Sequence, residues 1–225
     1  MLADRYRVYA LDQRGHGDSI KPLSGAYSLR QTADDALAFI DALDLERPVL
    51  IGHSWGGATA LVLASGTGSQ EPAPNFFHII LEDPAHNFGR GDPEKRAADF
   101  TRDIGRPTGE LRAEITASSP GWTEADIEGK IDALRKVTRE AVVSVFAEAG
   151  SAGDLLPLLA KIAVPTLLIR AEPALGTTLD EAAWERARHY LSAHSRAVQL
   201  DGATHNIHRG KFNEFMQVVN AFLSQ

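Results

Sequence analysis

The segment 51–59, "IGHSWGGAT", places a serine between two glycines in the pattern Gly52-x-Ser54-x-Gly56. Such a serine can be a nucleophile when it lies on a tight turn between a strand and a helix, because glycines tolerate the cramped backbone that projects the hydroxyl outward. The same pattern also occurs in tight turns that have no chemical role. The neighbouring residues and elements decide between the two interpretations.

A serine hydroxyl is a weak nucleophile unless a base accepts its proton, and that base is commonly held by a carboxylate. His205 is the candidate base, because it lies in the loop "DGATHNIHRG" between the last predicted strand and the last predicted helix. Among the other histidines, His53 beside the serine is interpreted as a packed residue. His16 in "RGHG" either faces the site or is a polar residue of a turn.

Two carboxylates are candidates for the acid that holds His205. Asp83 directly follows an apolar run, and Glu172 lies in the loop "AEPALG" after another. We prefer Asp83, since a carboxylate at the end of a strand is held more firmly than one on a loop. The alternative for Asp83 is a turn residue before Pro84, and the alternative for Glu172 is a solvated loop charge.

The elements that would position these residues follow an alternating pattern of short apolar runs and longer segments of helical period, which predicts an α/β fold with a mostly parallel sheet. Strands are predicted at 6–12, 47–54, 76–83, 164–170 and 196–200, and helices at 28–45, 55–66, 180–193 and the C-terminus. Ser28 and Gln31 have the spacing of a capping box. Ser54 would thus lie between a strand and a helix, as a nucleophile requires.

Strand signals are lacking between about 87 and 163. Helices are predicted instead after Asp92 and Pro93, around 108–118, from Thr123 through Val145, and in "DLLPLLAKI". A helical block between two strands of one sheet predicts a cap. We therefore expect an α/β core formed by 1–86 and 164–225, with 87–163 inserted as a helical cap.

Composition limits the classes of function. A chain of 225 residues with 44% apolar residues can bury a core, and its net charge of -7 gives no electrostatic reason to bind nucleic acid. No apolar run reaches the roughly 20 residues of a membrane span, and no signal-peptide pattern precedes the first strand, so we expect a cytoplasmic protein. The chain lacks cysteine, and His86, His205 and His208 lack the spacing of a helical metal site, so we expect no metal.

The segments "YRVYALDQRGHGDS", "LIGHSWGG", "IILEDPA", "VPTLLIR" and "GATHNI" resemble landmarks of the α/β-hydrolase family, in its usual order of serine, acid and histidine. The resemblance covers nearly the whole chain. It implies Ser54 as nucleophile, His205 as general base, a small-molecule substrate and no cofactor. It also implies that the Trp55 amide is an oxyanion donor, and that cap aromatics line the substrate entrance, with Phe88, Phe100, Trp122 and Phe146 as candidates.

The sequence departs from the family pattern in two places. Ala174 stands where the family usually has an aspartate in a Gly-x-x-Asp loop, which leaves the acid open between Asp83 and Glu172. Family members also begin with two or three further strands and a His-Gly loop that gives a second oxyanion donor, and nothing before Tyr6 supplies these. We therefore expect an amino-terminally incomplete chain rather than a rearranged one.

The sequence thus predicts a serine hydrolase that cleaves a small or medium carboxylic ester through an acyl-enzyme. Carbon–carbon bond hydrolysis, perhydrolysis and non-catalytic ligand binding are the alternatives. Dehalogenase and epoxide hydrolase chemistry is disfavoured, because those relatives attack with an aspartate at the position of Ser54.

Overall fold

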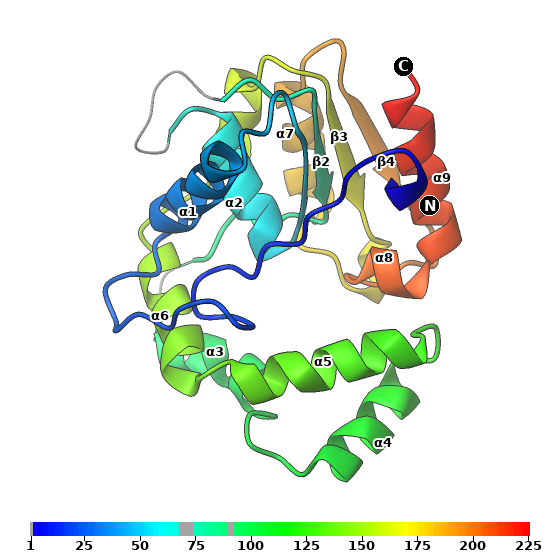
Figure 1. Ribbon diagram of the computed structural model, residues 1–225. Coiled ribbons are helices and arrows are strands. Elements are labelled where there is room, and N and C mark those ends of the chain that lie inside the picture. The colour runs from blue at the N-terminus through cyan, green and yellow to red at the C-terminus, as the bar shows by residue number, and fades with distance from the viewer. Residues whose placement is uncertain (1, 68–73, 90–91) are drawn as a thin grey trace.

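A four-stranded parallel sheet lies at the centre of the computed structural model, with helices on both faces (Figure 1). The structure describes residues 2–67, 74–89 and 92–225. The strand order is β1 (Val49–His53), β2 (His78–Glu82), β3 (Thr166–Arg170) and β4 (Arg196–Gln199). The predicted α/β fold is confirmed. Parts of the expected core and cap, residues 1, 68–73 and 90–91, lie outside the described residues.

The central strands β2 and β3 are buried along their whole length, as continuous apolar runs predict for strands covered on both faces. Their side chains alternate between two cores because successive strand residues point to opposite faces. Ile79, Leu81 and Leu168 pack with α1 (Leu29–Ala42), α2 (Trp55–Ala64) and α7 (Glu181–Tyr190). Ile80, Leu167 and Ile169 pack with α9 (Phe212–Leu223), which follows the short α8 (Ile207–Gly210).

Four helices separate β2 from β3 in the chain: α3 (Pro93–Thr101), α4 (Thr108–Ser118), α5 (Glu124–Lys136) and α6 (Arg139–Ala149). A 3-10 helix at Leu156–Lys161 leads back to the sheet. Helices α4 and α5 share a small apolar cluster of their own and lie apart from the sheet, beyond the carboxyl ends of its strands (Figure 1).

The single helix predicted from Thr123 through Val145 is wrong, because two helices occupy this range. Helix α5 ends at Lys136, and Val137 has extended backbone angles of φ −81° and ψ 148°. The Thr138 hydroxyl then accepts the amide hydrogen of Ala141 and starts α6. Apolar residues continue across the break at helical spacing, so periodicity alone does not reveal it.

The strand predicted at 6–12 is also absent from the described structure. This segment crosses in front of the sheet without pairing with β1 (Figure 1). Together with β1 and α1, it lines an apolar cavity of about 830 Å³. Val8 and Leu11 remain 56% and 39% exposed. An alternating apolar pattern indicates an extended backbone, but a strand also needs a partner for its backbone hydrogen bonds.

Candidate active site

Ser54 lies on the turn between β1 and α2 with φ 50° and ψ −114°, a backbone conformation that non-glycine residues rarely adopt. Its amide donates to the Glu82 carbonyl at 3.1 Å, and its carbonyl accepts from the amides of Ala58 and Ala85 at 3.0 and 2.9 Å. The turn is therefore held by the first turn of α2 and by the end of β2.

The glycines that this turn requires differ in part from those in the sequence pattern. A Cβ atom on Gly52 would lie 2.3 Å from the Gly56 carbonyl oxygen, and one on Gly57 would lie 2.6 Å from the Cβ of Pro84. A Cβ on Gly56 would meet only the Gln13 side chain, at 3.8 Å. Close packing of strand, turn and helix thus explains Gly52 and Gly57, whereas Gly56 has room for a side chain.

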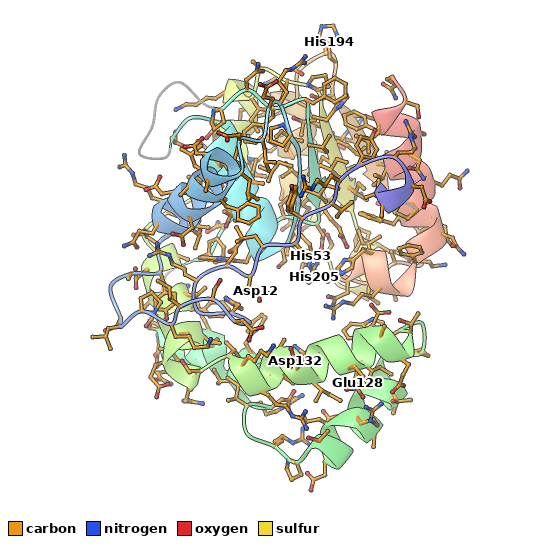
Figure 2. All side chains as sticks on the ribbon, viewed as in Figure 1. Asp12, His53, Glu128, Asp132, His194 and His205 are labelled. Carbon is orange, nitrogen blue, oxygen red and sulfur yellow. The ribbon has the colours of Figure 1, made fainter. Side chains whose placement is uncertain are left out.

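Ser54, His205 and Asp83 form a continuous chain of hydrogen bonds. His205 Nε2 lies 2.9 Å from Ser54 Oγ, and His205 Nδ1 lies 2.6 Å from Asp83 Oδ2. Because a carboxylate can only accept, the neutral ring carries its proton on Nδ1 and leaves Nε2 free to accept the serine proton. The residues follow β1, β2 and β4, and the carboxyl ends of parallel strands meet at one edge of the sheet. Figure 2 labels His205 at this edge.

Asp83 is fully buried and receives hydrogen bonds from three directions. Besides His205, the Thr177 hydroxyl donates to its Oδ1 and the Thr178 amide donates to its Oδ2 at 3.1 Å. Burial by itself raises the pKa of this carboxyl, but these hydrogen bonds outweigh burial and hold the pKa below its usual value. Asp83 is therefore a carboxylate at neutral pH and stabilises a protonated His205.

Glu172 does not contact His205 within the described structure. Its carboxylate accepts the amide hydrogen of Gly202 at 2.6 Å and joins the loops after β3 and β4. The loop that carries Glu172 contributes Thr177 and Thr178 instead, and sequence reasoning missed both. Two adjacent hydroxyl residues after Gly176, in the loop searched for an acid, were the available signal.

Two further histidines pack around His205. The carbonyl of His205 accepts a hydrogen bond from His53 Nε2 at 2.9 Å, and the two rings lie 4.6 Å apart between centroids (Figure 2). Burial lowers the pKa of His53 to about 4, so this ring is neutral at pH 7. His208 Nδ1 lies 2.8 Å from the buried carboxylate of Glu82. Both contacts hold the His205 loop in place.

A cavity of about 860 Å³ opens above Ser54 and His205. Phe88, Phe100 and Phe146, three of the four aromatic residues expected at the substrate entrance, line this cavity. Trp122 does not line it. That ring packs against the apolar cluster of α4 and α5 and is covered by the Arg209 guanidinium, 4.5 Å from the ring centroid. An aromatic residue in a helical segment fits a core as well as a pocket, and periodicity cannot distinguish them.

Trp55 is the first residue of α2, so its amide has no acceptor one turn earlier in the helix. Its side chain lines the cavity and contacts Phe88 edge to face, with ring centroids 5.2 Å apart. His16 lines the same cavity from the loop before α1. A free amide at a helix N-terminus beside Ser54 is suited to stabilise negative charge on a substrate oxygen.

The histidines considered for a metal site have other partners. His86 Nε2 contacts the Thr178 carbonyl at 2.9 Å, and His208 pairs with Glu82. Within the described residues, no three histidine or carboxylate side chains come together as metal ligands would. A search of the same residues finds no helix with the length and apolar character needed to cross a membrane.

Comparison with known proteins relates most of the chain to one family. The family model described as "Alpha/beta hydrolase family" matches residues 1–216. 3-Oxoadipate enol-lactonase 1 of Acinetobacter baylyi is 25% identical over 231 residues, which cover 99% of this chain and 80% of the relative. Epoxide hydrolase A of Mycobacterium tuberculosis is 28% identical over 281 residues, which cover 99% of this chain and 84% of the relative.

A solved structure gives the same result. The enol-lactonase from Burkholderia xenovorans matches with a TM-score of 0.69 and 26% sequence identity, over 95% of this chain and 79% of that chain. The chain belongs to the alpha/beta hydrolase family, and it is a hydrolase.

Proposed function

We propose that this protein cleaves small or medium carboxylic esters through an acyl-enzyme on Ser54. The hydrogen-bonded chain from Ser54 Oγ through His205 to Asp83 is the observation that supports the proposal most strongly. Relatives named enol-lactonases favour ester hydrolysis over carbon–carbon hydrolysis or perhydrolysis, because a lactone is an internal ester. A catalytic arrangement this complete also favours an enzyme over a non-catalytic binding protein.

In the first half-reaction, His205 Nε2 takes the proton of Ser54 while Oγ attacks the acyl carbon. The carbonyl electrons move to the oxygen, where the Trp55 amide stabilises the negative charge. The C–O bond to the alcohol then breaks, and His205 returns its proton to the leaving oxygen. Asp83 stabilises the imidazolium while it carries that proton.

In the second half-reaction, water replaces the alcohol. His205 accepts a proton from water as its oxygen attacks the acyl carbon of the acyl-enzyme. The bond to Ser54 Oγ breaks, the serine regains its proton from His205, and the carboxylic acid leaves. No cofactor is needed for either step.

The segment 87–163 acts in this proposal as a cap on the α/β core of 1–86 and 164–225. Phe88 and Phe146 contact apolar parts of the substrate, since both line the cavity above Ser54. A cavity of about 860 Å³ suits a small molecule, because ligand pockets typically measure about 300–1,000 Å³.

Replacing Ser54 tests the proposal. Ser54→Ala should lower kcat for p-nitrophenyl acetate by ~10⁴ to 10⁶, the loss typical of a triad nucleophile. The melting temperature should change little, because only a hydroxyl is removed. Ser118→Ala is the matched control, since this exposed hydroxyl on α4 contacts only the Ile115 carbonyl. A Ser54→Ala variant with most of its activity would overturn the proposal.

A further inference from the structure

The cavity above Ser54 is lined by cationic side chains and, among the described residues, by no carboxylate. Lys130 and Arg96 line it, together with histidines and apolar residues, but no aspartate or glutamate does. This is opposite to the chain as a whole, in which 30 acidic residues outnumber 23 basic ones. The acidic residues that the structure describes thus lie outside the cavity lining.

Lys130 lies in the middle of α5 and is half-buried on the cavity side. The described residues give its ammonium group neither a hydrogen bond nor an ion pair within 4.0 Å. Burial lowers the pKa of Lys130, the charge of Arg209 acts in the same direction, and Asp103 opposes both. The cavity therefore holds a cation whose charge is poorly compensated by the surrounding side chains.

Carboxylates on α5 and in the segment before α4 already have partners. Figure 2 labels Glu128 and Asp132 on the same helix. They and their neighbours make ion pairs or cap hydrogen bonds: Glu128 with Arg112, Asp132 with Lys136, Asp126 with Thr123, and Asp103 with Arg102 and Arg106. None of these carboxylates lines the cavity. The negative charge that pairs with Lys130 would thus come from a molecule that enters the cavity.

Arg96 also adds positive charge, but only its buried Nε lacks a hydrogen-bond partner. Its two terminal nitrogens donate to the carbonyls of Phe88 and Phe146, which ties the segment after β2 to α6. Carbonyl oxygens satisfy these donors but do not neutralise the guanidinium charge. Arg96 therefore raises the positive potential of the cavity, whereas Lys130 has donors available for a ligand.

We propose that the preferred substrate carries a carboxylate in addition to the ester group, and that the Lys130 ammonium binds this carboxylate while Ser54 attacks the ester. The inference rests on the proposed ester hydrolysis. One ammonium on a flexible stem matches a singly charged carboxylate better than a doubly charged phosphate, which arginine forks bind in two places. Lys130 is thus a specificity-determining residue of the cap.

Two matched pairs of esters test this proposal. p-Nitrophenyl hydrogen glutarate and p-nitrophenyl pentanoate have acyl chains of equal length, with and without a terminal carboxylate. 4-Acetoxybenzoate and phenyl acetate share the acetyl group and differ in whether the leaving group carries a carboxylate. The measured quantity is the ratio of kcat/KM for the charged ester to that for its neutral partner, which cancels any general loss of folding or catalysis.

The wild type should favour the charged ester at least about tenfold in one of the pairs, the lower limit for a hydrogen bond between charged groups. Lys130→Met should remove this preference, and Lys130→Arg should restore most of it because the positive charge returns. Lys95→Met is the matched control, since Lys95 is exposed on α3 and does not line the cavity; its ratio should equal that of the wild type.

Three results would overturn the proposal in distinguishable ways. If the wild type cleaves all four esters without preferring either charged one, the carboxylate inference fails and ester hydrolysis stands. If Lys130→Met keeps the preference, Lys130 is not the binding group. If none of the esters is cleaved, the proposed function fails, and the inference that rests on it fails too.

Discussion

Asp83 owes its position on His205 to residues far away in the chain. Thr177 and Thr178, which hydrogen bond to its carboxylate, lie 94 and 95 positions later. Its own backbone has a φ of 38°, so a buried turn directs the side chain along the sheet edge toward the histidine. At the scale of the residue, the proposed acid is thus defined by tertiary contacts rather than by local sequence.

Comparing two amide variants tests this choice of acid. Asp83→Asn should lower kcat by ~10⁴, because an asparagine can donate to Nδ1 and favour the wrong tautomer of the base. Glu172→Gln should change kcat by less than about threefold, since that carboxylate contacts a backbone amide and not His205. Circular dichroism confirms folding of both variants. A larger loss of kcat for Glu172→Gln than for Asp83→Asn would identify Glu172 as the acid.

Ser54 and Asp83 could be proposed from the sequence because each lies at the end of an apolar run that predicts a strand, and His205 because it lies in the loop after the last such run. Residues that act through loops could not be predicted in the same way. The adjacent hydroxyl residues Thr177 and Thr178 give only a weak signal, and Lys130 carries no pattern that separates it from an ordinary polar residue. The prediction that Trp122 lies at the substrate entrance rests only on its aromatic ring and on its position in the expected cap.

At the scale of the element, the serine turn depends on close contact between β1 and the start of α2. The sequence pattern highlights Gly52 and Gly56, but only Gly52 and Gly57 lie against atoms that exclude a side chain. The difference arises because one face of α2 meets β1 and Pro84, and the next residue around the helix faces away. A local contact also explains the break between α5 and α6. The Thr138 side chain caps the N-terminus of α6, a feature that the periodicity of apolar residues does not reveal.

Three alanine variants test this geometry. Gly52→Ala should lower the free energy of unfolding by about 1–3 kcal/mol, because its Cβ meets a backbone oxygen that cannot move freely. Gly56→Ala should be much milder. Gly129→Ala, in the middle of α5 with open space around it, should raise stability by about 0.5–1 kcal/mol through helix propensity. Urea denaturation measures all three, and an undiminished stability for Gly52→Ala would contradict the described turn.

At the scale of the whole molecule, the sheet brings together residues that are 122 and 151 positions apart, from Asp83 and Ser54 to His205. Four of the five predicted strands are paired in the sheet, and the two central ones are recognisable in the sequence as continuous apolar runs. The strand predicted at 6–12 is absent from the described sheet, because the pattern of this segment indicates an extended backbone but does not show whether it pairs with a neighbouring strand. The cavity is also a whole-molecule feature, because the segment 87–163, which supplies Arg96 and Lys130, lines it together with residues from before and after that segment.

Covalent labelling by a fluorophosphonate, read out by peptide mass spectrometry, tests the central claim most directly. The reagent reacts with serine hydroxyls that are activated by a base. The folded wild type should carry one adduct on Ser54, His205→Ala should react far more slowly, and urea-unfolded protein should not react, because unfolding separates the serine from its base. An unmodified Ser54 in the folded wild type, or labelling that survives unfolding, would contradict the account.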